Sequence, residues 1–74
     1  MNNRIRVLRA EHELSQAALA ELVGVSRQAI NAVEKGKHVP SLTLAFDIAH
    51  AFNCRVDEVF EPPYQIGESD KSHN

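Results

Sequence analysis

The sequence predicts an all-α protein, a compact domain of five short helices, and three observations lead to this prediction. The chain has 74 residues with one cysteine and three glycines, so it offers no disulfide framework and helices must supply its core. Ser15, Ser26 and Ser41 each stand directly before apolar residues at helical spacing, where a serine side chain caps a helix. Gly24 and Gly36 stand where two of these patterns end.

The first two helices are predicted from apolar spacing and helix-forming residues. Ile5 and Leu8 lie three residues apart, which predicts a helix over Asn3–Glu13 with one buried stripe. Ser15 then caps a helix over Gln16–Val23, a segment rich in alanine and leucine. Ala18 stands where a capping box needs Glu or Gln, so we expect a single cap.

The third helix follows a short turn and is predicted to have two unlike faces. Gly24 adopts a left-handed conformation cheaply because it has no Cβ, and Ser26 caps the helix that Gly36 ends. A connection of about three residues between two short helices is typical of a helix-turn-helix. We expect three polar residues to face away from the core together. The inward residues are Ile30 and Val33, and the outward ones are Arg27, Gln28 and Asn31.

Fewer polar residues mark the start and end of the last two predicted helices. Ser41 caps a helix from Leu42 to about Phe52, and Asn53-Cys54 breaks it before a final helix over Val56–Phe60. The expected buried stripe of the fourth helix is Leu42, Ala45, Ile48, Ala49 and Phe52. We assign residues 1–61 to one domain and residues 62–74 to a polar, acidic, mobile tail.

Charge is divided unequally along the chain. The formal net charge is −2, but seven basic and five acidic residues precede residue 56, whereas one basic and five acidic residues follow. A basic patch can therefore attract phosphates although the total is negative. No apolar run approaches the roughly 20 residues of a membrane span, and no apolar stretch of a signal peptide follows the N-terminal arginines. We expect a cytoplasmic protein with no membrane partner.

Residues 8–60, LRAEHELSQAALAELVGVSRQAINAVEKGKHVPSLTLAFDIAHAFNCRVDEVF, resemble the phage repressor and Cro-like helix-turn-helix regulators, also called the xenobiotic-response-element family. The most specific shared elements are Ser15-Gln16, Gly24, Ser26-Arg27-Gln28, Glu34-Lys35-Gly36-Lys37, Pro40-Ser41-Leu42 and Asp57-Glu58-Val59-Phe60. The resemblance implies the five-helix fold of the lambda repressor, double-stranded DNA as the partner, and a third helix that lies in the major groove.

The resemblance also implies roles for single residues. Base contacts are expected from Ser26, Arg27, Gln28, Asn31 and Ala32. Phosphate contacts are expected from Gln16, Lys35, Lys37 and Ser41. Arg9 and Glu34 are expected to form a structural ion pair between the first helix and the end of the third. The function that follows is a sequence-specific transcriptional regulator, a repressor, that binds operator half-sites as a homodimer.

Other functions stay open at this point. The same fold serves as the antitoxin of a toxin–antitoxin pair, and it can be a protein-interaction module without DNA binding. His50 and Cys54 lie four residues apart, but two ligands with no third predict no metal site, and we expect no cofactor. No catalytic signature is present, so we do not expect an enzyme. The acidic C-terminal stretch is first interpreted as a solubilising end, and Tyr64 and Ile66 raise the alternative hypothesis that the segment 60–66 carries the dimer contact.

Overall fold

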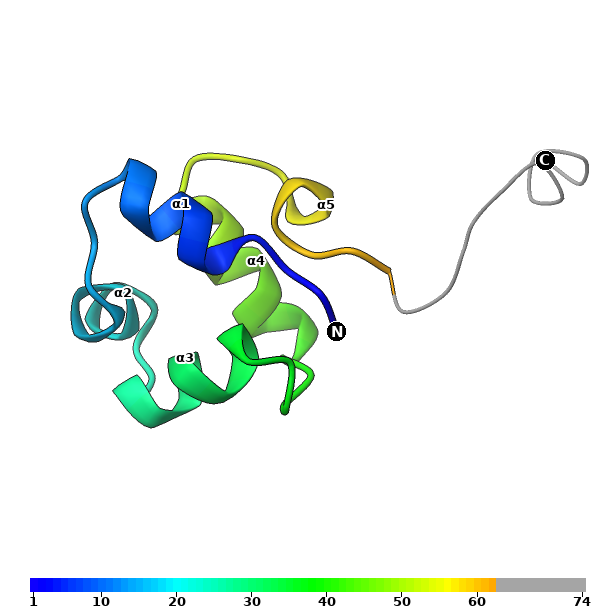
Figure 1. The fold of residues 1–74 in the computed structure, drawn as a ribbon, viewed down its shortest axis with the longest axis horizontal. Helices are drawn as coiled ribbons and strands as arrows, with labels where there is room; N and C mark the ends of the chain where they lie inside the picture. The colour runs from blue at the N-terminus through cyan, green and yellow to red at the C-terminus, as the bar shows by residue number, and fades with distance from the viewer. Residues whose placement is uncertain (63–74) are drawn as a thin grey trace, which may run out of the picture.

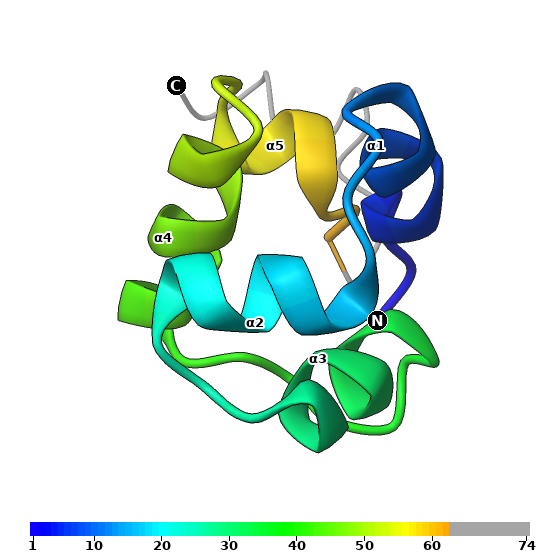
Figure 2. The same cartoon turned by 90° about the vertical axis from the view of Figure 1, so that its left-hand side faces the viewer.

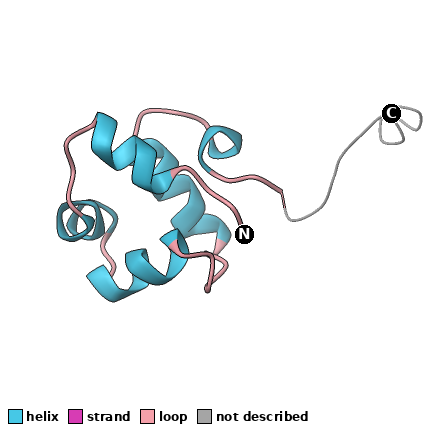
Figure 3. Cartoon of the chain, viewed as in Figure 1, coloured by secondary structure: helices cyan, strands magenta, loops and turns pink. Residues whose placement is uncertain are grey.

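The computed structural model describes residues 1–62 and has five α-helices in chain order (Figures 1 and 3). This confirms the predicted all-α fold. The helices are α1 (Ile5–Glu11), α2 (Gln16–Val23), α3 (Arg27–Glu34), α4 (Leu42–Ala51) and α5 (Val56–Val59). None of the helices in this described part is long and apolar enough to cross a membrane.

Figure 2 shows how the helices enclose the core. α4 and α1 lie on opposite sides of the molecule, α5 joins them at one end, and α2 crosses between them at the other with α3 beneath it. α2 packs against both α3 and α4, and α4 packs against α5. One flank of α3 therefore rests on the rest of the domain while its other flank is left at the surface.

Three of the predicted helix ends were wrong, and two of them are explained by backbone pairing at the N-terminus, which competes with helix formation. The first helix begins at Ile5 and not at Asn3, since Asn3 forms an extended bridge with Phe60. The same bridge keeps Phe60 out of the fifth helix, which ends at Val59. The first helix also ends at Glu11, because Glu13 adopts a positive φ of 55°.

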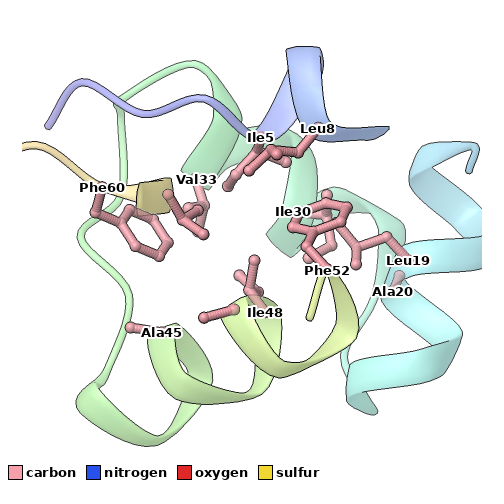
Figure 4. Close-up of a cluster of buried hydrophobic side chains, with 12 residues drawn as sticks. Ile5, Leu8, Leu19, Ala20, Ile30, Val33, Ala45, Ile48, Phe52 and Phe60 are labelled. Carbon is pink, nitrogen blue, oxygen red and sulfur yellow. The ribbon is translucent and has the colours of Figure 1, made fainter. Parts of the chain in front are cut away.

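The core is apolar and draws on every helix (Figure 4). Its fully buried large side chains are Ile5, Leu19, Ile30, Val33, Ile48 and Val59. At about 25 cal/mol per Å² of apolar surface, this cluster is the main stabilising contribution in a domain of this size.

One residue of the predicted α4 stripe was wrong. Ala45, Ile48, Ala49 and Phe52 are buried, but Leu42 is 72% exposed. Leu42 is the first residue of α4 and follows directly from the exposed connection after α3, so no helix within residues 1–62 covers its side. Helical spacing alone does not show where the cover provided by other helices begins.

The chain beyond α5 returns to the N-terminus. The Arg4 amide donates to the Val59 carbonyl oxygen at 2.8 Å, and the Glu61 amide donates to the Asn2 carbonyl oxygen at 2.9 Å. Phe60 is 7% exposed and belongs to the core, so it is not free for the dimer contact predicted for segment 60–66. Tyr64 and Ile66, together with nearly all of the predicted tail, lie outside the described residues.

Candidate nucleic-acid interface

The turn before α3 fixes where this helix begins. Gly24 has a φ of 75° and ends α2, and the Val25 amide donates to the Ala20 carbonyl oxygen at 3.0 Å. Ser26 is extended, and its hydroxyl oxygen accepts from the Ala29 amide at 3.0 Å. The predicted glycine turn and serine cap are both present, and they aim the first turn of α3 outward.

The two faces of α3 differ as the sequence predicts. Ile30 and Val33 are 0% and 1% exposed, and they anchor the helix in the core. Arg27 and Gln28 are exposed, and neither side chain has a hydrogen-bond or ion-pair partner within residues 1–62. Ser26 is exposed beside them, and the methyl group of Ala32 is half-buried. Arg27 and Gln28 thus keep their donors free for an external ligand.

Asn31 does not lie freely with this outward set. It is half-buried, and its Oδ1 accepts from Gln16 Nε2 at 3.2 Å. The same Gln16 nitrogen donates to Glu34 Oε1, also at 3.2 Å. A hydrogen bond therefore joins Asn31, a predicted base contact, to Gln16, a predicted phosphate contact at the start of α2.

Arg9 and Glu34 form an ion pair between α1 and the end of α3. Arg9 Nε lies 2.6 Å from Glu34 Oε2, and Nη2 lies 3.1 Å from Oε1. The Nη1 group of Arg9 donates to the Leu14 carbonyl oxygen at 3.0 Å, so one guanidinium links three segments of the chain. This paired geometry is the strong form of an ion pair because two parallel hydrogen bonds fix it.

The environment keeps Glu34 charged. Burial alone would raise the pKa of Glu34. Hydrogen bonds from Arg9 and Gln16 and the positive charges of Arg9 and Arg6 lower this pKa by more than burial raises it, so the net shift is downward. The hydrogen bond to Glu34 raises the pKa of Arg9. Both partners therefore stay ionised in the folded protein over a wide pH range.

Of the other predicted phosphate contacts, Lys35 and Lys37 follow the C-terminal end of α3, and Ser41 stands directly before α4. Lys35 is the exposed residue that ends the helix, Gly36 follows with a φ of 75°, and Lys37 is exposed in the next connection. Ser41 is exposed, and its oxygen accepts from the Leu44 amide at 3.1 Å, so it caps α4 as predicted. Its hydroxyl hydrogen remains available to donate.

Sequence reasoning missed the role of Asn3, whose side chain helps to hold α3 in place. Its Nδ2 donates to the Val33 carbonyl oxygen at 2.9 Å, and its Oδ1 accepts from the Ile5 amide at 3.1 Å. One amide thus holds the end of α3 against the beginning of α1. No local signal could have identified it, since its partner lies 30 residues away in the chain.

The residues considered for a metal site are not part of this surface. His50 is exposed on α4, and Cys54 is partly buried beyond the end of that helix. Burial and the nearby Glu58 raise the pKa of the Cys54 thiol, which favours the neutral form. Within residues 1–62 there is no group of three or more His, Cys, Asp or Glu side chains that could hold a metal ion.

Comparison with known proteins places this surface in context. A helix-turn-helix family matches residues 5–59. An uncharacterised HTH-type transcriptional regulator of Methanocaldococcus jannaschii is 50% identical over 60 residues, which are 81% of this chain and 91% of that protein. The regulator YgzD of Bacillus subtilis is 48% identical over 60 residues, with the same shares covered.

Two solved structures share the fold. The restriction-modification controller protein C.AhdI of Aeromonas hydrophila is 37% identical with a TM-score of 0.72, covering 77% of this chain and 86% of that one. The repressor protein c2 of phage P22, in a complex with a synthetic operator, is 35% identical with a TM-score of 0.70, covering 73% of this chain and 82% of that one.

Proposed function

This chain belongs to the helix-turn-helix family of DNA-binding transcriptional regulators, and from this premise we propose that it is a repressor that reads operator half-sites with α3 in the major groove. The observation that carries the proposal is the pair Arg27 and Gln28, exposed at the start of a helix whose other face is fixed in the core.

The chemistry of this pair suits the edges of DNA bases. An arginine can donate two hydrogen bonds to guanine O6 and N7, and a glutamine can match adenine N6 and N7. Ser26 lies beside them, and the Ala32 methyl group is suited to a thymine methyl. The donors of Arg27 and Gln28 satisfy no group within the described chain, so binding DNA breaks no internal contact.

Phosphate contacts complete the proposed interface. Lys35, Lys37 and Ser41 lie at or beyond the C-terminal end of α3, on the exposed segment before α4. The first backbone N–H groups of α2 have no partner inside the helix and favour an anion. We assign Asn31 to holding Gln16, and not to base reading, because the hydrogen bond between them keeps Asn31 against α2.

Repression follows from binding alone. A protein seated on a promoter excludes RNA polymerase, so the proposal requires no cofactor and no catalytic step. It also implies that the protein acts in the cytoplasm, with its DNA.

The proposal includes a homodimer, because helix-turn-helix proteins commonly bind two half-sites one helical turn apart. Exposed apolar side chains support it: Val39, Leu42 and Phe46 are 62%, 72% and 57% exposed. Leu42 and Phe46 lie four residues apart on α4, and Val39 lies in the connection just before that helix. We propose that a second copy covers them. Sedimentation tests this: Phe46→Glu should yield a monomer, whereas loss of the dimer in a chain ending at Glu61 would assign the contact to the tail.

The experiment that tests the base-reading role compares wild type with Arg27→Ala on matched duplexes. Loss of the two hydrogen bonds should cost about 1–3 kcal/mol on the cognate site and relax the preference at one base pair. Equal losses on every sequence tested would contradict the role. Lys37→Ala is the matched control, because loss of a phosphate contact should weaken binding to all sequences alike and lower the salt slope by about one.

A further inference from the structure

A small polar hollow lies between α1, the start of α2 and the end of α3. Its volume is about 260 Å³. The lining side chains are those of Arg6, Arg9, Gln16, Asn31, Glu34 and Lys35. Arg6 was not among the residues that the sequence singled out, and its helix, α1, carries no predicted DNA contact.

The charges of this hollow do not balance. Three of the six lining residues are cations and one is an anion. Arg9 and Glu34 satisfy each other through two hydrogen bonds. Arg6 and Lys35 are exposed and form no ion pair within residues 1–62. Two unpaired cations therefore share the rim of one hollow.

The interior of the hollow is arranged so that Glu34 does not repel an anion. Its carboxylate accepts from Arg9 and from Gln16, so its oxygens already have donors. Arg6 lines the hollow, and its positive charge helps to lower the pKa of Glu34. The field at the rim is then set by Arg6 and Lys35.

The position of the hollow relative to the base-reading residues suggests its ligand. α3 has eight residues, so its two ends are about 12 Å apart. The major groove of B-DNA is about 12 Å wide between its two flanking backbones, so a helix of this length with one end at the base edges can bring its other end close to a backbone. Arg27 and Gln28 occupy one end of α3, and Lys35 occupies the other.

We propose that Arg6 and Lys35 together bind a backbone phosphate of the DNA at the rim of this hollow, so that α1 takes part in DNA binding. This inference rests on the proposed function. The ligand chemistry is a phosphodiester with one negative charge, which two cations on a short rim can contact from both sides. Arg9, although it lines the same hollow, does not contribute, because Glu34 holds its guanidinium.

The test measures duplex binding as a function of salt concentration for wild type, Arg6→Gln, Lys35→Gln and the double variant. Each single change should lower the slope of log K against log salt by about one, and the double variant by about two, with no change in sequence preference. Arg55→Gln is the matched control. Arg55 is an exposed arginine that pairs with Asp57 and does not line the hollow. Its slope should equal that of wild type.

Three results would overturn the inference. Unchanged slopes in Arg6→Gln, in a protein whose wild type binds DNA sequence-specifically, would reject the contact while leaving the proposed function intact. If wild type bound no duplex, the proposed function would fail, and the inference with it. Saturable NMR shifts at Arg6 and Lys35 on adding inorganic phosphate, with unchanged salt slopes on DNA, would assign the hollow to a small free anion.

Discussion

Helices α2 and α3 are built to the same local plan, and yet they do different things. Each has eight residues, begins directly after a serine whose oxygen accepts from the third amide of the helix at 3.0 Å, and is followed within two residues by a glycine with a φ of 75°. α2 is mostly apolar and lies between α3 and α4. α3 has one buried face, and at its start the exposed side chains of Arg27 and Gln28 have no partner within residues 1–62.

The difference teaches that caps and turns decide where a helix lies, whereas the pattern between them decides what it does. α2 packs against both α3 and α4, buries Leu19 and Ala20 and leaves Glu21 and Leu22 exposed, and it acts as a support for α3. A helix with one apolar stripe is held by that stripe and presents the rest to a partner.

The buried residues of the two helices should be equally important for stability. Leu19 in α2 and Ile30 in α3 are both 0% exposed. Leu19→Ala and Ile30→Ala should each lower the free energy of unfolding by about 2–5 kcal/mol, because each leaves a cavity. Urea denaturation followed by circular dichroism measures both. A loss below about 1 kcal/mol at Ile30 would mean that α3 is not held by its inward face.

The ion pair that joins α3 to α1 should have the next largest effect on the free energy of unfolding. Arg9→Ala should cost about 1–3 kcal/mol, because it leaves the half-buried Glu34 without its main donors. Glu34→Gln is the informative partner variant, since it removes the charge and keeps the size. Denaturation at neutral pH compares the two, and a stability equal to wild type in Arg9→Ala would remove the pair from the account.

The pH dependence of stability should reveal the contribution of the ionised Glu34 carboxylate. Its pKa is lowered in the folded protein, so its contribution is complete above the ordinary pKa of a glutamate and is lost as the pH falls through the folded value. Wild type should therefore lose stability over this acidic range, and Glu34→Gln should lose less. Parallel curves for the two proteins would show that other carboxylates cause the acid effect.

The caps should have equal and smaller effects. Ser15→Ala and Ser26→Ala should each cost about 1 kcal/mol, because each leaves one amide at a helix start without its acceptor. Thermal or urea unfolding can compare them side by side. A much larger loss of DNA affinity in Ser26→Ala than in Ser15→Ala, at similar stability, would support a base contact by Ser26 itself.

The exposed polar residues should have the smallest effect on stability and the clearest difference in function. Glu21→Ala in α2 and Gln28→Ala in α3 should each change stability by less than about 0.5 kcal/mol, because both side chains are exposed. Only Gln28→Ala should weaken sequence-specific DNA binding. Equal binding by the two variants would erase the functional difference between the helices.

Much of this molecule could be predicted because its signals are local. The serine caps, the left-handed Gly24 and the inward pair Ile30 and Val33 all depend on residues within one or two turns. The exposed positions Arg27 and Gln28 follow from the same spacing, because a residue opposite a buried stripe faces solvent.

What could not be predicted depends on residues distant in the chain. Asn3 leaves the helical pattern because Phe60 pairs with its backbone, and its side chain bonds to Val33. Asn31 leaves the outward set because Gln16, 15 residues away, donates to it. Leu42 fits its stripe but lacks a neighbour to cover it. Periodicity gives the direction of a side chain, and only the assembled fold shows what it meets.

The most direct test of the central claim, that the outward face of α3 reads DNA, is the selection of bound duplexes from a random-sequence pool. Wild type and an Arg27→Ala, Gln28→Ala double variant are compared at one fixed salt concentration. We predict that wild type enriches a two-fold symmetric motif and that the double variant loses it. No enrichment by wild type, or the same motif in the double variant, would contradict the account.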